Sequence, residues 1–174
     1  MKKFTFVILH YITIDDTVKC VDSILEKCNK KNFEIVIVDN GSKNQTGEVL
    51  KEKYKCNNKI HVILSKENLG FAKGNNLGFE YAKNTLKTDF IIMLNNDVVV
   101  LQDDFCDIIE KEYETSKFAV LGPKIMLKDN SICEYEDELP SLKDIKRIRR
   151  KTKRLYIFNK IFLIRMFNST RWFF

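Results

Sequence analysis

The chain has 174 residues, of which 44% are hydrophobic and 31% charged, a balance typical of one globular domain that excludes a disordered or fibrous protein. Its formal net charge of +6 is unevenly distributed, because residues 143–174 hold 11 Lys or Arg and one acidic residue, which leaves the remainder mildly acidic. This distribution argues against a uniformly basic nucleic-acid binder, and we expect no nucleic-acid partner.

Short apolar runs alternate with helical patterns along the chain. The runs rich in β-branched and aromatic residues predict strands at Phe4–Leu9, Phe33–Val38, Ile60–Leu64 and Phe90–Leu94. Apolar residues at helical spacing predict helices after Asp15-Asp16, at Glu48–Tyr54, at Gly70–Lys83 and around Phe105–Tyr113. This alternation predicts an α/β fold, with a Rossmann-like, mostly parallel sheet flanked by helices.

The end of the chain has a weaker pattern. We expect a short strand at Pro123–Leu127 and divide the chain into one domain, residues 1–140, and a basic, aromatic-rich, helical tail, residues 141–174. The tail allows two interpretations. It lies as a basic amphipathic segment on an anionic membrane surface, or its apolar residues dock against a partner.

The five cysteines include no CxxC pair and have no nearby histidine, which favours reduced thiols over a zinc site or disulfide framework. At the N-terminus, His10 and Asp15-Asp16 interrupt the first apolar run, which favours a buried strand over a secretory signal. No apolar run approaches the ~18 residues of a membrane-spanning helix. We therefore expect a cytoplasmic protein, peripheral at the inner face of the membrane if the tail binds lipid.

Polar residues follow three of the predicted strands, at His10-Tyr11, at Asp39–Ser42 and at Asn95–Asp97. Ligands of open parallel sheets bind outside the carboxyl ends of the strands, so we expect these residues to converge on one crevice. A carboxylate such as Asp39 can accept hydrogen bonds from a base or a ribose. The segment Asp-Asn-Gly-Ser is also ordinary turn chemistry, and by itself decides nothing.

A glycine-rich segment, Asn68–Gly78, opens the third predicted helix. Gly70, Gly74 and Gly78 are four residues apart and therefore share one helix face, which permits close approach of either a ligand or the sheet. Lys73 either offsets the charge of a bound diphosphate or is a solvated lysine. The segment is neither a Walker loop nor a G-x-G-x-x-G dinucleotide motif.

The triplet Asn95-Asn96-Asp97 offers one carboxylate and neutral amide oxygens. A hard cation such as Mg²⁺ often takes one or two carboxylates and completes its shell with substrate phosphates. The triplet therefore predicts a Mg²⁺ or Mn²⁺ site through Asp97, with a helix-capping turn as the alternative.

Taken in order, segments 6–11, 35–42, 68–78 and 91–97 resemble the family-2 glycosyltransferases, especially bacterial rhamnosyltransferase-like members that build cell-surface polysaccharides. The resemblance covers about Phe4 to Leu127. It implies a nucleotide-diphospho-sugar transferase-like fold, with Asp39 on the nucleotide base and Asp97 on the metal of the donor diphosphate. The other predicted nucleotide-binding residues are His10, Tyr11, Asn40, Ser42, Asn68, Lys73 and Asn96.

The chain departs from that family where the acceptor side should follow. A Gly-Gly-Phe-Asp-like segment and a Glu-Asp catalytic base are not found, and Glu136-Asp137 lacks the flanking sequence expected of a base. We therefore leave the catalytic base unassigned. We expect a truncated inverting transferase that binds a UDP- or dTDP-sugar for a saccharide or lipid-linked saccharide acceptor. The alternative is a non-catalytic nucleotide-sugar-binding remnant or membrane-surface module.

Overall fold

The computed structural model describes residues 2–28, 31–123, 126–127, 131 and 163–165, the last range as backbone only. The chain divides into two units, one formed by residues 1–121 with 162–174 and the other by residues 122–161. Most described residues belong to the first unit, which holds the sheet. Glu136-Asp137 and the predicted tail, except 163–165, lie outside the described residues, so the predicted domain boundary stays a prediction.

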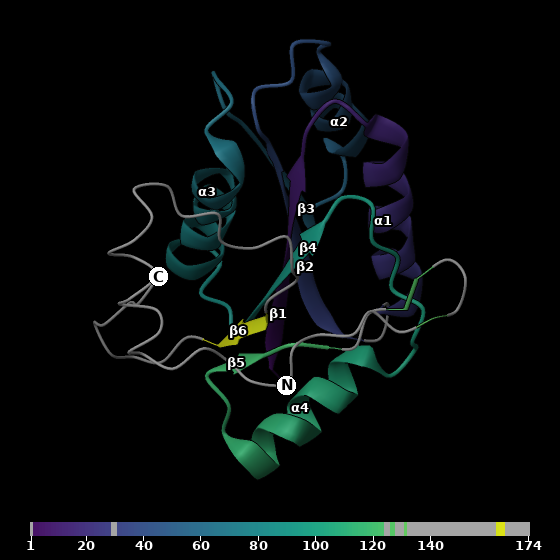
Figure 1. The fold of residues 1–174 in the computed structure, drawn as a ribbon, viewed down its shortest axis with the longest axis vertical. Coiled ribbons are helices and arrows are strands. Elements are labelled where there is room, and N and C mark those ends of the chain that lie inside the picture. The colour runs from purple at the N-terminus through teal and green to yellow at the C-terminus, as the bar shows by residue number, and fades with distance from the viewer. Residues whose placement is uncertain (1, 29–30, 124–125, 128–130, 132–162, 166–174) are drawn as a thin grey trace. The chain divides into compact units, whose positions relative to one another are not determined.

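The strands form one sheet in the order β3-β2-β1-β4-β6-β5 (Figure 1). Their bounds are β1 Lys3–His10, β2 Asn32–Asp39, β3 Ile60–Leu64, β4 Phe90–Asn95, β5 Val120–Leu121 and β6 Leu163–Arg165. Strands β1 to β4 pair in parallel, whereas β6 is antiparallel to both β4 and β5. The predicted α/β fold with a mostly parallel sheet is confirmed, and its four parallel strands match the expected limits within one residue.

The helices are α1 Ile14–Lys27, α2 Thr46–Tyr54, α3 Gly70–Asn84 and α4 Phe105–Ser116. Helix α3 lies on one face of the sheet, and α1 and α2 lie on the other (Figure 1). Asp15 and Asp16 occupy the first turn of α1, where carboxylates favour the positive end of the helix dipole. In the described part of the chain, no helix combines the length and apolarity needed to span a membrane.

Two expectations concern the end of the chain, most of which lies outside the described residues. Residues 163–165 form strand β6, whereas we expected a helical tail. Pairing with β4 and β5 decides this geometry, and a segment as short as Leu163–Arg165 does not predict such non-local pairing. The expected strand at Pro123–Leu127 falls partly outside the described residues, and within them only Met126 makes a β-bridge.

The register of the parallel strands brings their carboxyl ends level. His10 at the end of β1 lies opposite Asp39 at the end of β2. On the other side of β1, Leu9 lies opposite Asn95, the last residue of β4. Neighbouring strands are about 4.8 Å apart, so the residues after β2, β1 and β4 start from adjacent points of one edge.

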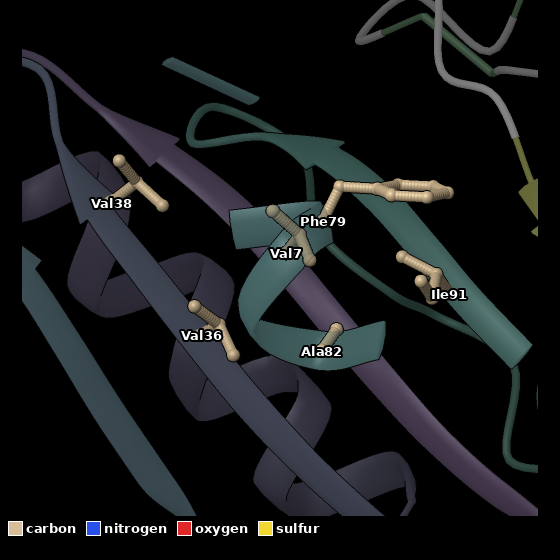
Figure 2. Close-up of a cluster of buried hydrophobic side chains, with 6 residues drawn as sticks. All are labelled: Val7, Val36, Val38, Phe79, Ala82 and Ile91. Atoms are coloured by element: carbon tan, nitrogen blue, oxygen red, sulfur yellow. The ribbon is translucent and has the colours of Figure 1, made fainter. Parts of the chain in front are cut away.

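Alternate residues of the central strands build the core beneath α3. Val7 of β1, Val36 and Val38 of β2 and Ile91 of β4 pack against Phe79 and Ala82 of α3 (Figure 2). The opposite face of β1 carries Phe4, Phe6, Ile8 and His10, all fully buried. A buried histidine therefore occupies the last position of an otherwise apolar row.

Two glycines of α3, Gly74 and Gly78, allow the helix to pack closely on the sheet. For these two, close approach of the sheet, one of the two predicted roles, is confirmed. A Cβ at Gly78 would lie 2.4 Å from Val7 Cγ1, and a Cβ at Gly74 would lie 2.6 Å from Leu9 Cδ1. Gly70 differs, because it has a φ of +78° and open space around its Cα. Its role is the turn that starts the helix.

Replacement of Gly78 by alanine tests this packing. Alanine favours helix by about 1 kcal/mol relative to glycine, yet the clash with Val7 and Val38 should overpack the core. We expect Gly78→Ala to lower the free energy of unfolding by about 1–3 kcal/mol in urea titrations. The exposed Glu80→Ala change on the same helix is the control and should have little effect. A more stable Gly78→Ala chain would contradict the close contact.

Candidate functional site

The loops after β1, β2, β3 and β4 meet at the carboxyl edge of the sheet. The Asn40 N–H donates to the His10 carbonyl at 2.9 Å, which ties the second loop to the first. The Ser65 N–H donates to the Asp39 carbonyl at 2.9 Å, which ties the third loop to the second. The sheet register places Asn96 beside the same edge, one residue beyond Asn95. The predicted convergence of polar residues is therefore present.

Asp39 lies at the base of this edge and is only 3% exposed. Both of its carboxylate oxygens lie 3.3 Å from the Ser42 N–H. The carboxylate also packs against the first turn of α2, where a Cβ at Gly47 would lie 2.5 Å from Asp39 Oδ2. Glycine at position 47 is therefore the residue that leaves room for this carboxylate, in the positive field of a helix N-terminus.

Asn40 holds the second and third loops together through its side-chain amide. Its Oδ1 accepts from the Leu69 N–H at 2.9 Å, and its Nδ2 donates to Asn68 Oδ1 at 3.1 Å. Asn68 Oδ1 also accepts from the Gly70 N–H at 2.8 Å. The amide of Asn40 is thus used within the protein, whereas Asn68 remains exposed at the rim.

Ile12 in the first loop has a strained backbone, with a φ of +67°. Positive φ in a β-branched residue is rare and costs of order 1–3 kcal/mol, so neighbouring groups must hold it. The Ile12 N–H donates to Ser42 Oγ at 2.9 Å, and its carbonyl accepts from Asn44 Nδ2 at 3.0 Å. The second loop therefore fixes the first loop, and the preceding residue, Tyr11, stands 40% exposed.

His10 is fully buried beneath these loops, and both of its ring nitrogens are engaged. Nδ1 lies 2.7 Å from Thr17 Oγ1 in α1, and Nε2 lies 2.8 Å from Thr46 Oγ1 in α2. Nε2 is also 3.9 Å from Asp39 Oδ1. Burial lowers the pKa of His10 below its usual value, and the opposing attraction of Asp39 does not restore it. His10 is therefore neutral at pH 7 and supports the site from below.

Asn96 and Asp97 follow β4 and differ in their contacts. Asn96 Nδ2 donates to Thr13 Oγ1 at 2.8 Å and to Thr17 Oγ1 at 3.1 Å, which fixes the amide against α1. The Asp97 side chain is exposed and makes no hydrogen bond or ion pair with another described residue. Its negative charge, after the larger effect of burial, helps to raise the pKa of the Cys20 thiol to about 12.

Among the described residues that follow β4, Asp97 offers one carboxylate to a divalent cation. Within the described ranges no three His, Cys, Asp or Glu side chains gather into a metal site. A hard cation needs only oxygen ligands, and phosphates can supply the rest. The unengaged carboxylate of Asp97 fits that mode of binding, whereas a pre-formed site made of protein ligands alone does not fit these residues.

Lys73 lies in the first turn of α3, exposed, and no ion pair with another described residue holds it. It is thus free to meet an anion.

Several supporting residues were not predicted from the sequence. Thr17, Thr46 and Asn44 look like ordinary helix-start residues, and only the fold brings the two threonines to His10 and Asn44 to Ile12. Gly47 was the one available signal, because a glycine in a first helical turn often marks a close approach.

A cavity of about 270 Å³ lies at the opposite, amino end of β1 and β4. Its lining includes Lys2, Asp89, Glu110 and Tyr113. None of the predicted site residues borders it. The candidate site is therefore the open edge formed by the four loops, and this cavity is separate from it.

The buried, neutral state of His10 predicts a pH-dependent stability. The unfolded chain takes up a proton on this ring near pH 6.5, whereas the folded chain takes it up at a lower pH. The unfolded state then binds more protons in that interval, so the free energy of unfolding should fall as the pH drops from about 6.5 through the folded pKa. Urea titrations at pH 7.5, 6.5 and 5.5 measure this decline.

The second histidine supplies the control. The decline should persist in His61→Gln and flatten in His10→Gln, whose side chain does not titrate. The ionisation of Glu34 affects the free energy of unfolding in a separate, more acidic pH range. Burial alone would raise its carboxyl pKa, but hydrogen bonds from Lys3 and His61 and their charges leave the pKa below its usual value. A decline that vanishes in His61→Gln would contradict the role given to His10.

Comparison with known proteins identifies the protein family of the chain. The family model for glycosyl transferase family 2 matches residues 5–170. A low-salt glycan biosynthesis hexosyltransferase of Haloferax volcanii is 25% identical over 96 residues, which are 55% of this chain and 29% of the relative. The glycosyltransferase GlyG of Streptococcus pneumoniae is 27% identical over 105 residues, which are 60% of this chain and 33% of the relative. The chain thus spans about a third of these relatives.

Solved structures share the fold at low sequence identity. TarS of S. aureus, residues 1–349 in complex with UDP, superposes with a TM-score of 0.62 at 19% identity, over 76% of this chain and 38% of that 1–349 chain. A mannosyltransferase of Pyrobaculum calidifontis, in complex with GDP-Man and Mn²⁺, gives a TM-score of 0.58 at 16% identity, over 67% of this chain and 34% of that enzyme.

Proposed function

The chain belongs to glycosyltransferase family 2, and we propose that its carboxyl-edge loops bind a nucleotide-diphospho-sugar donor for glycosyl transfer. The observation that carries this proposal is the level register of β2, β1 and β4. It brings Asp39 to one side of His10 and Asn96-Asp97 to the other. A ligand with a nucleoside at one end and a diphosphate at the other matches that order.

On the nucleoside side, we assign Asp39 to the base and Tyr11 and Ser42 to the walls around it. Asp39 keeps acceptor capacity beyond its contacts with the Ser42 N–H, because a carboxylate has about four lone-pair sites. Tyr11 is exposed where the strained turn at Ile12 presents it. Asn40 acts through Asn68, which it holds at the rim.

On the diphosphate side, we assign Asp97 to a Mg²⁺ or Mn²⁺ ion and Lys73 to the phosphate charge. A bound divalent cation would stabilise the negative charge that develops on the leaving diphosphate. The residues fit this role because the Asp97 carboxylate is exposed, and because among the described residues neither Asp97 nor Lys73 has a partner in an ion pair. Asn96 orients this loop through its hydrogen bonds to Thr13 and Thr17.

The reaction proposed for the whole protein is an inverting displacement. An acceptor hydroxyl loses its proton to a carboxylate and forms a bond to the anomeric carbon, while the bond from that carbon to the diphosphate oxygen breaks. UDP- or dTDP-sugars are the proposed donors, and a saccharide or lipid-linked saccharide of the cell surface is the proposed acceptor. We assign only the donor side to the described residues, and any membrane contact to the tail, residues 141–174.

Calorimetric titration of the 174-residue chain with UDP and dTDP, with and without Mn²⁺, tests the donor site. We expect binding that strengthens with Mn²⁺ and weakens at least about tenfold in Asp97→Asn, because the metal loses its carboxylate. Asp103→Asn is the matched control, since that exposed carboxylate pairs with Lys27 away from the site. Absence of binding by the folded wild-type chain would contradict the proposal.

The base side is tested separately. Asp39→Asn keeps the shape of the side chain but removes a charged acceptor, so affinity for UDP should fall about tenfold. The dependence on Mn²⁺ should remain in this variant, because Asp97 is unchanged. GDP serves as the third nucleotide, and a preference for GDP would reject the UDP or dTDP assignment while leaving the site in place.

A further inference from the structure

A row of hydrogen bonds crosses the sheet edge beneath the proposed donor site, and His10 lies at its centre. It runs from Asn96 in the loop after β4, through Thr17, His10 and Thr46, to Asn44 in the loop after β2. Each step measures between 2.7 and 3.1 Å. The row therefore joins the loop that carries Asp97 to the loop that follows Asp39.

The contacts of Asn44, at one end of the row, fix which atom donates and which accepts in each hydrogen bond. Asn44 donates through Nδ2 to the Ile12 carbonyl, so its Oδ1 faces Thr46 and accepts from the Thr46 hydroxyl at 2.7 Å. A hydroxyl has one hydrogen, so Thr46 Oγ1 can only accept from His10. The proton of the neutral ring is therefore on Nε2.

The other ring nitrogen completes the same direction. Nδ1 must accept, and the Thr17 hydroxyl at 2.7 Å is its donor, closer than the 3.2 Å from that hydroxyl to the Thr13 carbonyl. Thr17 Oγ1 in turn accepts from Asn96 Nδ2. All the bonds then point one way, from Asn96 to Asn44, and such chains strengthen one another in a buried site.

Burial keeps the ring neutral against the attraction of Asp39, which would favour its protonated form. Asp39 is the charged group that acts on His10 among the described residues. Helices α1 and α2 present the neutral hydroxyls of Thr17 and Thr46 to the ring, and the loop after β4 adds the neutral amide of Asn96 behind Thr17. A neutral ring can serve both neighbours at once, one as donor and one as acceptor.

We propose that His10, as its Nε2–H tautomer, is a positioning residue that sets the two loops between which the nucleoside and the diphosphate of the donor bind. The inference rests on the proposed donor site. It gives His10 no contact with the donor. The ring holds the first turns of α1 and α2, and through them Asn96 and the loop of Asp39 and Ser42, in one fixed arrangement.

Two pairs of variants separate this role from simple packing. Thr46→Val and Thr17→Val remove the hydroxyl partners of His10 at nearly constant volume, whereas Thr46→Ser and Thr17→Ser keep them. We expect each valine variant to bind UDP with Mn²⁺ about three- to tenfold more weakly, the equivalent of one hydrogen bond. Each serine variant should stay within about twofold of wild type, since its hydroxyl restores the bond.

Thr5 provides the matched control on the same strand. It is fully buried and its hydroxyl has no hydrogen-bond partner among the described residues, so Thr5→Val should leave UDP binding unchanged. The ring itself gives a second readout. The chain has two histidines, so ¹⁵N–¹H NMR of the imidazoles, assigned with His61→Gln, should show His10 as the Nε2–H tautomer, and Thr46→Val should alter that signature.

The outcomes are distinct. If wild type binds UDP and the valine variants bind equally well, or if His10 is found as the Nδ1–H tautomer, the positioning role is overturned and the donor site stands. If wild type binds none of UDP, dTDP and GDP with Mn²⁺, the donor site fails and the positioning role fails with it. Weaker binding in the valine variants, with recovery in the serine variants and the expected tautomer, supports the inference.

Discussion

The parallel pairing of β2, β1 and β4 is the constraint on which the rest of the structure depends. Because His10 is level with Asp39 and Leu9 is level with Asn95, the loops that follow these strands start from one edge. Tight packing of α3 on β1 and β2 maintains that alignment, through glycines that have no Cβ to separate helix from sheet. A slip by one residue would turn every side chain of a strand to the opposite face. The polar ends of the strands would then no longer meet.

The burial of polar His10, Thr17 and Thr46 beneath this edge of the sheet has a physical reason. An apolar residue at position 10 would continue the row of Phe4, Phe6 and Ile8 and would avoid the cost of burying an imidazole. The hydrogen bonds to Thr17 and Thr46 offset that cost, and they add what apolar packing lacks, a defined direction and spacing between two helices. The strained turn at Ile12 is held in the same way by Ser42 and Asn44. Both features stabilise loops that have little apolar burial of their own.

The sequence predicted the elements well and their mutual contacts poorly, for one reason. Apolar periodicity is a local property, so the four parallel strands and their helices follow from it. Strand β6 depends on pairing with β4 and β5, which are remote in sequence, so the local sequence did not predict it. Asp39 and Asp97 were predicted as site residues because they lie at or just beyond the ends of β2 and β4, and their roles remain a prediction. The burial of His10, its two threonine partners and the contact of Asp39 with Gly47 arise only when α1 and α2 close over β1 and β2.

The most direct test of the account is a crystal structure of the chain with UDP and Mn²⁺, using anomalous scattering from manganese to locate the metal. The account predicts one manganese peak beside the Asp97 carboxylate, with the diphosphate next to it and the base near Asp39. His10 should remain buried and make no contact with the nucleotide. A nucleotide in the cavity at the amino ends of β1 and β4, or a manganese ion away from Asp97, would contradict the assignment of the carboxyl edge as the donor site.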